Sequence, residues 1–187
     1  RPRAPSSFRR QHQAMLPTAT PADPEPLLRL LLPGQPARVR EALAWLARPG
    51  HHLLGRQDPR YPPLLRQAPQ PPQALFVDGD PDLLWLPAVA VVGSRAARAA
   101  GAGGCDNARR FSATLCRAGV AITSGLAAGI DASAHQAALA TPAGITLAVL
   151  GTGPDLAYPR RHADLRERIA AQGAVVSEHP PGTAART

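Results

Sequence analysis

Four short apolar segments, each followed by small polar residues, constrain the fold of this 187-residue chain more than any other feature. The segments are Ala88–Val92, Val120–Thr123, Ile145–Leu150 and Ala174–Val176. Stretches of helical length separate them, at about residues 106–118, 131–139 and 161–172. Strands that alternate with helices through short connections pair in parallel, with right-handed crossovers. The sequence therefore predicts an α/β, Rossmann-like fold, with a parallel sheet that carries helices on both faces.

Two finer expectations follow from the side-chain pattern. The first segment is apolar throughout, which predicts a strand that is buried on both faces. In the helix that follows it, Ala108, Phe111 and Leu115 fall on one stripe, which predicts that these three side chains face the core.

The chain before residue 87 divides into three parts. Residues 1–24 are rich in Pro and Arg without helical or strand periodicity, which predicts a flexible arm. Residues 25–50 predict a small helical module, because Leu27, Leu28, Leu31 and Leu32 precede a second helix with Val39, Leu43 and Leu46 on one face. Residues 51–86 predict a Pro-rich connector on the surface, with short strands at His51–Leu54 and Ala74–Val77. Residues 87–187 then form the Rossmann-like domain.

The charge of the chain points to a polyanionic partner. Its formal net charge is +8, its pI is about 11.2, and all 21 basic residues are Arg. No apolar run approaches the roughly 20 residues that cross a bilayer, so no membrane span is expected. Cys105 and Cys116 lie in one predicted helix, roughly 16 Å apart, too far for a disulfide. With no signal peptide recognised either, the expected compartment is a reducing cytoplasm.

The residues after the four strands predict an anion-binding site. Parallel strands bring these loops to one edge of the sheet, where glycine exposes backbone amides and serine adds hydroxyl donors. Four guanidinium groups at this edge suit several phosphates in a row. The candidate binding residues are Gly93, Ser94, Arg95, Arg98, Ser124, Gly125, Gly129, Gly151, Gly153, Arg160 and Arg161.

Other site chemistries are less well supported by the residues. No G-x-G-x-x-G follows the first strand and no carboxylate ends the second, so no nicotinamide cofactor is expected. Asp131 and His135 have helical spacing, but two ligands make no metal site; we expect Asp131 to cap a helix and His135 to be structural. Glu178 leaves one alternative open, a nucleotide-processing hydrolase of the phosphoribohydrolase type with this carboxylate as general base.

Several spaced motifs together resemble the DNA-processing protein A family (DprA, also called Smf). They are Val91–Arg95, Ser124–His135, Gly151–Pro159 and Ser177–Thr183, and upstream Asp58–Leu65 and Pro71–Gly79. The resemblance covers about residues 37–183. It implies a bacterial protein of the cytoplasm that binds single-stranded DNA through its Rossmann-like domain. It further implies that the protein protects incoming DNA during natural transformation, helps to load the recombinase RecA, is not an enzyme and forms a homodimer.

The resemblance also assigns residues and marks departures. The DNA-contacting arginine of the family's Gly-Ser-Arg motif corresponds to Arg95, and the basic positions after Tyr158-Pro159 correspond to Arg160 and Arg161. Arg98 stands where the family usually has Thr or Ser. The module at 25–50 resembles a shortened sterile-alpha-motif-like domain. The sequence stops at Thr187, before the family's Phe-Pro-x-Arg-Asn-Arg stretch, so we expect an incomplete domain that lacks much of the dimer surface.

Overall fold

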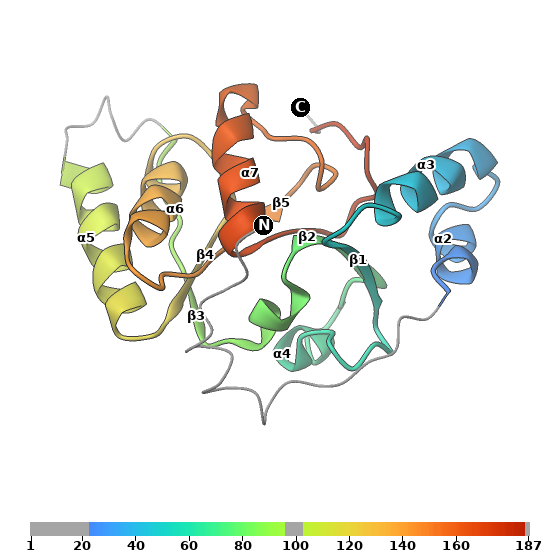
Figure 1. Ribbon diagram of the computed structural model, residues 1–187, viewed down its shortest axis with the longest axis horizontal. Helices are drawn as coiled ribbons and strands as arrows, with labels where there is room; N and C mark the ends of the chain where they lie inside the picture. Colours follow the sequence, from blue (N-terminus) through green and yellow to red (C-terminus); the bar gives the residue numbers. More distant parts are fainter. Residues whose placement is uncertain (1–22, 96–102, 186–187) are drawn as a thin grey trace.

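The computed structural model describes residues 23–95 and 103–185 (Figure 1). Its helices are α2 (Glu25–Leu31), α3 (Pro36–Leu46), α4 (Pro63–Arg66), α5 (Gly103–Arg117), α6 (Ile130–Ala140) and α7 (Ala163–Gln172), with 3-10 turns η2 (Pro81–Trp85) and η3 (Arg160–His162). Its strands are β1 (His51–Gly55), β2 (Ala74–Gly79), β3 (Ala88–Ala90), β4 (Ala121–Ser124), β5 (Thr146–Leu150) and β6 (Ala174–Ser177).

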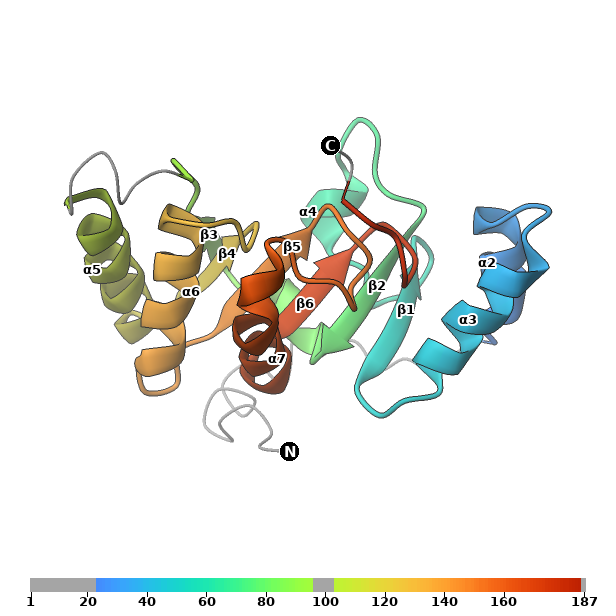
Figure 2. The same cartoon turned by 90° about the horizontal axis from the view of Figure 1, so that it is seen from above.

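The strands form one six-stranded sheet in the order β1-β2-β6-β5-β4-β3, which Figure 2 shows from above. The last four are parallel to one another, so the α/β prediction is confirmed and the four loops leave the sheet at one edge. The sheet is mixed, however, because β2 pairs antiparallel with both β1 and β6. The expectation of a wholly parallel sheet is corrected in this respect.

Both faces of the sheet carry helices, but the three crossover helices α5, α6 and α7 lie on the same face (Figure 1). The reason is the sequential order of the parallel strands, since right-handed crossovers that always step in one direction stay on one side. On the opposite face, η2 and α4 cover β2 and β6. Leu83, Leu86 and Leu65 pack there around the buried Tyr61.

The segment 51–86 is part of the sheet and not a linker on its surface. Its two short strands were expected, but they pair along five residues and then continue the sheet through β6. Tyr61 and Phe76 in this segment are 0% and 1% exposed. Phe76 also packs against α2 and α3, where Leu28, Val39 and Trp45 bury the module's apolar side. The proposed division of the chain at residues 50 and 86 stays a prediction.

β3 differs most from its sequence pattern. It is the last strand of the sheet, its three residues are exposed, and Val89 and Val92 are 41% and 73% exposed. This strand was expected to be buried on both faces, and that prediction is wrong because the strand lies at the edge of the sheet. The stripe expected on α5 is also partly wrong, because Phe111 is 69% exposed while Cys105, Ser112 and Cys116 join Ala108 in facing inward. Both cysteines are free, as predicted.

Candidate functional site

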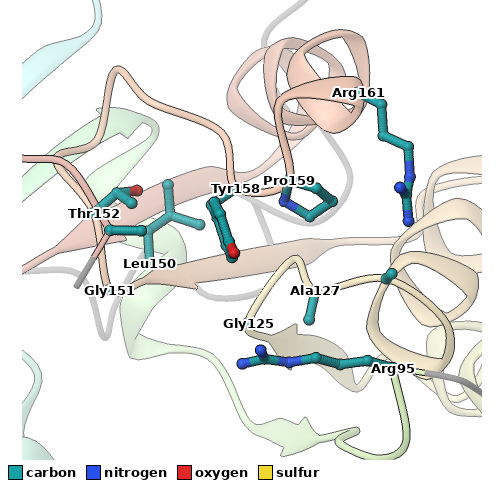
Figure 3. Close-up of a pocket in the computed structure, with 11 residues that line it drawn as sticks. Arg95, Gly125, Ala127, Leu150, Gly151, Thr152, Tyr158, Pro159 and Arg161 are labelled. Atoms are coloured by element: carbon teal, nitrogen blue, oxygen red, sulfur yellow. The ribbon is translucent and has the colours of Figure 1, made fainter. Parts of the chain in front are cut away.

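A hollow of about 700 Å³ lies at the carboxyl edge of the parallel strands (Figure 3). The loops after β3, β4 and β5 line it, together with Ala185 from the segment that follows β6. The convergence of loops that the topology predicted is therefore present. The lining residues are Arg95, Gly125, Ala127, Ala128, Leu150, Gly151, Thr152, Tyr158, Pro159, Arg161 and Ala185.

Two guanidinium groups and one aromatic ring define the chemistry of this hollow. Figure 3 shows the side chain of Arg95 running along one wall of the hollow toward Gly151. The ring of Tyr158 is directed toward the Arg95 side chain, and the side chain of Arg161 descends from the opposite rim. Tyr158 is 55% exposed, so its ring is available for contact with a ligand. Among the described residues, neither arginine is paired with a carboxylate. The hollow thus combines cationic groups with an apolar wall of Leu150 and Pro159.

The loop between β4 and α6 is held from behind by Asp131. Sequence reasoning expected this residue to cap α6, but it lies inside the helix, whose N-cap is Gly129. Its buried carboxylate accepts hydrogen bonds from the amides of Gly125 at 3.1 Å and Ala127 at 3.3 Å. The Asp side chain therefore fixes the shape of the loop, and the two amides that it accepts from are not free to bind an anion.

Gly129 allows the loops after β3 and β4 to touch. Its φ is +82°, and a Cβ at this position would lie 2.4 Å from the carbonyl oxygen of Ser94. That oxygen accepts a hydrogen bond from the Ile130 amide at 3.4 Å, so an N-terminal donor of α6 is also engaged within the protein. The contact fixes the backbone immediately before Arg95.

Other predicted donors are engaged inside the protein as well. The Ser124 hydroxyl is buried and donates to the Val91 carbonyl at 2.6 Å, and the Gly153 amide donates to the Thr183 carbonyl at 2.8 Å. The Ser177 hydroxyl donates to the Thr152 carbonyl at 2.6 Å. These residues shape the loops, and the groups left to attract an anion are chiefly the two guanidiniums.

The segment after β6 is tied to the loop after β5. The Gly182 amide donates to the Asp155 carboxylate at 2.9 Å, and the Thr183 hydroxyl donates to the Pro180 carbonyl. Arg38 on α3 donates to the Thr183 hydroxyl oxygen at 2.9 Å, which connects the helical module to the same segment. The rim of the hollow near Ala185 is thereby held by contacts from three separate parts of the chain.

The remaining predicted residues have different positions. Arg98 lies outside the described residues. Arg160 is exposed and does not line the hollow, whereas its neighbour Arg161 does. Gly93 and Ser94 do not line the hollow, and Gly93 lies so close to Ile130 that a Cβ would be 2.8 Å from the Ile130 side chain. The predicted binding residues did not include seven residues that line the hollow, since nothing in the local sequence marks an apolar or neutral residue as part of a site. They are Ala127, Ala128, Leu150, Thr152, Tyr158, Pro159 and Ala185.

Glu178, the base of the alternative hydrolase, does not line the hollow. Its side chain is 57% exposed and lies 3.9 Å from His179. His135 is structural, as expected: it is 0% exposed, and its Nδ1 lies 2.7 Å from the Thr146 hydroxyl. Within residues 23–95 and 103–185, no group of three or more metal-ligating side chains is present. No helix in these ranges is long and apolar enough to cross a membrane.

Comparisons with known proteins agree with one another. The family model of DNA recombination-mediator protein A matches residues 52–187. Protein Smf of Escherichia coli K12 is 46% identical over 143 residues, which are 76% of this chain and 37% of that protein. DNA processing protein DprA of Streptococcus pneumoniae is 42% identical over 125 residues, 67% of this chain and 43% of that protein. The chain thus spans less than half the length of these relatives.

Two solved structures have the same fold. The X-ray structure of DNA processing protein A from Streptococcus pneumoniae matches with a TM-score of 0.68 at 30% identity, over 96% of this chain and 63% of that one. DNA processing protein A from Helicobacter pylori, whose structure addresses a single-stranded DNA binding mode, matches with a TM-score of 0.61 at 26% identity, over 68% and 56% of the two chains. The Rossmann-like α/β class is therefore confirmed independently of the sheet topology.

Proposed function

This chain belongs to the DNA recombination-mediator protein A family, and from that membership we propose that it binds single-stranded DNA in the hollow between Arg95 and Arg161. The observation that carries the proposal is the pair of arginines without carboxylate partners, among the described residues, on either side of an apolar wall. Guanidinium groups bind the backbone phosphates of DNA whatever the base sequence, so binding is expected to be independent of sequence.

The single-stranded form suits the geometry better than a duplex. Tyr158 offers one exposed ring, and a base reaches such a ring only when it is free of its pairing partner. The hollow of about 700 Å³ has room for a nucleotide, whereas a duplex presents its phosphates on a wide cylinder. The Helicobacter pylori relative, described as a single-stranded DNA binder, supports the same preference.

The wider role that we propose is that of a recombination mediator. In this role the chain protects incoming DNA during natural transformation and helps to load RecA, in the cytoplasm and without catalysing a reaction. Family membership supports the role, and the net charge of +8 supports a nucleic-acid partner. The homodimer that the family resemblance implies is part of this proposal.

The candidate site residues divide in this proposal into contacts and supports. Arg95 and Arg161 contact phosphates, Gly151 allows the backbone to approach the DNA strand, and Gly129 allows the loops after β3 and β4 to touch. Gly93, Ser94, Ser124, Gly125 and Gly153 act by fixing the loops.

A fluorescent oligothymidylate titrated at several salt concentrations tests the proposal. Each phosphate contact on a single strand contributes about −0.7 to the slope of log affinity against log salt. Arg95→Gln and Arg161→Gln are each expected to flatten the slope by about that amount. Arg168→Gln removes an exposed charge of α7 that does not line the hollow and serves as the matched control.

Two outcomes would overturn the proposal. One is an Arg95→Gln variant whose affinity and salt slope equal those of Arg168→Gln. The other is release of free base from nucleoside monophosphates that is lost in Glu178→Gln, since this result would establish the hydrolase. A smaller loss in Arg160→Gln than in Arg161→Gln would support the side-chain positions described above.

A further inference from the structure

A second hollow of about 380 Å³ lies between α5 and the first turns of α6, next to the hollow described above. Its lining includes three guanidinium groups, from Arg95, Arg109 and Arg161, and the imidazole of His162. Ser133 and Gln136 on α6 add neutral polar groups. Cationic and polar side chains therefore surround it on several sides.

The two hollows share part of their walls. Arg95, Ala128 and Arg161 line both, so the two arginines stand at the boundary between them. A polymer that leaves the first hollow along this boundary enters the second without losing contact with either guanidinium. A compact ligand such as a mononucleotide would need only one of the two spaces.

The chemistry of the two hollows differs in a way that suits a nucleotide chain. The first presents Tyr158, Leu150 and Pro159, which are surfaces for a base or a sugar. The second presents a further cation, Arg109, and hydrogen-bonding groups, which suit a phosphate. Alternating apolar and charged surfaces correspond to the alternating groups of a strand.

We propose that single-stranded DNA bound in the first hollow continues between Arg95 and Arg161 into the second hollow, where Arg109 contacts a phosphate. This inference rests on the proposed function and adds to it the path of the strand and one contact on α5. The strand accordingly crosses the first turn of α6 and leaves the site along the exposed side of α5.

Asp106 limits the affinity of this second position. Its carboxylate lies 2.6 Å from the Arg109 guanidinium, and the two side chains are 59% and 49% exposed. Exposed pairs of this kind are weak, so a phosphate can replace the carboxylate at little cost. The carboxylate still repels the incoming phosphate, and Asp106→Asn is expected to tighten binding.

The test compares Arg109→Gln with Arg110→Gln. Arg110 is the next residue on α5, is exposed, and points about 100° away, outside both hollows. The two variants have identical net charge, so any difference reports the position of the charge. Binding is measured with an eight-nucleotide and a two-nucleotide oligothymidylate, again as a function of salt.

We expect Arg109→Gln to weaken binding of the longer strand roughly five-fold relative to Arg110→Gln, and to flatten its salt slope by about 0.7. The dinucleotide, which fits the first hollow alone, should bind the two variants equally. Equal affinities of the two variants for the longer strand would overturn the inference, as would an Asp106→Asn variant that binds no more tightly. Arg95→Gln separates the two proposals. If Arg95→Gln weakens binding and Arg109→Gln does not, the path through the second hollow is excluded and the proposed function stands. If Arg95→Gln has no effect either, the proposed function fails too.

Discussion

The Arg166 guanidinium on α7 donates through Nη2 to the Asp78 carboxylate on β2, at 2.5 Å, across 88 positions of the sequence. Its Nε donates to the carbonyl oxygen of Pro154, in the loop that borders the first hollow. His51 lies on the other side of the carboxylate, with Nε2 at 3.4 Å from Oδ1. A buried ionic contact thus joins the antiparallel part of the sheet to a loop of the site.

Replacement of one partner of this pair should be costly. Arg166→Met leaves Asp78 buried without its main counter-charge, and we expect a loss of about 3–5 kcal/mol in the free energy of unfolding. The double variant Asp78→Leu with Arg166→Met should lose less than Arg166→Met alone, because no charge is then left unpaired. Urea denaturation measures both, and Arg168→Met on the exposed side of α7 should change stability by less than about 0.5 kcal/mol. Similar losses in Arg166→Met and Arg168→Met would show that the buried pair contributes nothing.

His135 should make the protein sensitive to acid. Burial, the largest cause, lowers the pKa of this imidazole to about 4, from 6.5 in a model compound. The unfolded chain binds this proton at a higher pH than the folded one does. The contribution of neutral His135 to the free energy of unfolding is therefore fully present above pH 6.5 and is lost as the pH falls toward 4. The difference in pKa corresponds to a loss on the order of 3 kcal/mol.

The matched variant for this prediction is His135→Gln, which cannot titrate in this range and can still hydrogen-bond to Thr146. Free energies of unfolding are measured from pH 7.5 to pH 4 in both proteins. The difference between the two curves isolates His135, since other titrating groups such as His52 are present in both. Parallel curves over this range would contradict the prediction.

Asp131→Ala provides a test in which charge and geometry act in opposite directions. The variant is one unit more positive, so a purely electrostatic effect would strengthen DNA binding. We expect weaker binding, by several-fold, because the amides of Gly125 and Ala127 lose their common acceptor and the loop loses its shape. Stability should fall by about 2 kcal/mol. Asp131→Asn retains one acceptor oxygen, so its affinity and stability should lie between those of the unmodified protein and those of Asp131→Ala. Tighter binding by Asp131→Ala would show that Asp131 does not fix the loop.

Gly129→Ala should disturb the backbone before Arg95. The added Cβ meets the Ser94 carbonyl at 2.4 Å and the Arg95 carbonyl at 3.1 Å, at a φ that disfavours side chains. We expect a loss of about 1–3 kcal/mol in stability and a clear loss of affinity for single-stranded DNA. Gly119→Ala is the control, since its φ is +80° but nothing lies within 4 Å of the new Cβ. Equal losses in the two variants would mean that φ alone, and not the contact, accounts for the effect.

The parallel half of the fold could be predicted because its signals are local. Each strand is a short apolar run, each helix has its own spacing, and the handedness of crossovers brings the loops to one edge. The antiparallel half could not be recognised as part of the sheet. The pairing partners of β2 on β6 are about 100 residues away, from Phe76 to Ser177, and the Pro-rich surroundings of β2 favour a surface linker.

The site was predicted at the level of loops and less well at the level of atoms. Arg95 and Arg161 line the hollow, yet sequence spacing cannot separate Arg161 from Arg160, because the turn η3 decides which of them faces inward. Asp131 fits a capping pattern by position, but the amides that donate to its carboxylate are those of Gly125 and Ala127, because the loop folds back on the helix. Such hydrogen bonds within a loop leave no periodic trace in a sequence.

The position of β3 has a practical consequence for every titration described above. A strand edge with Val89 and Val92 exposed can adhere to the same edge of a second molecule. Concentrated salt releases phosphate contacts but favours apolar association, so the two equilibria respond to ionic strength with opposite sign. Nanomolar protein keeps such self-association from distorting the DNA isotherm, and a charged replacement such as Val92→Glu should leave the chain monodisperse at concentrations where the parent molecule is not.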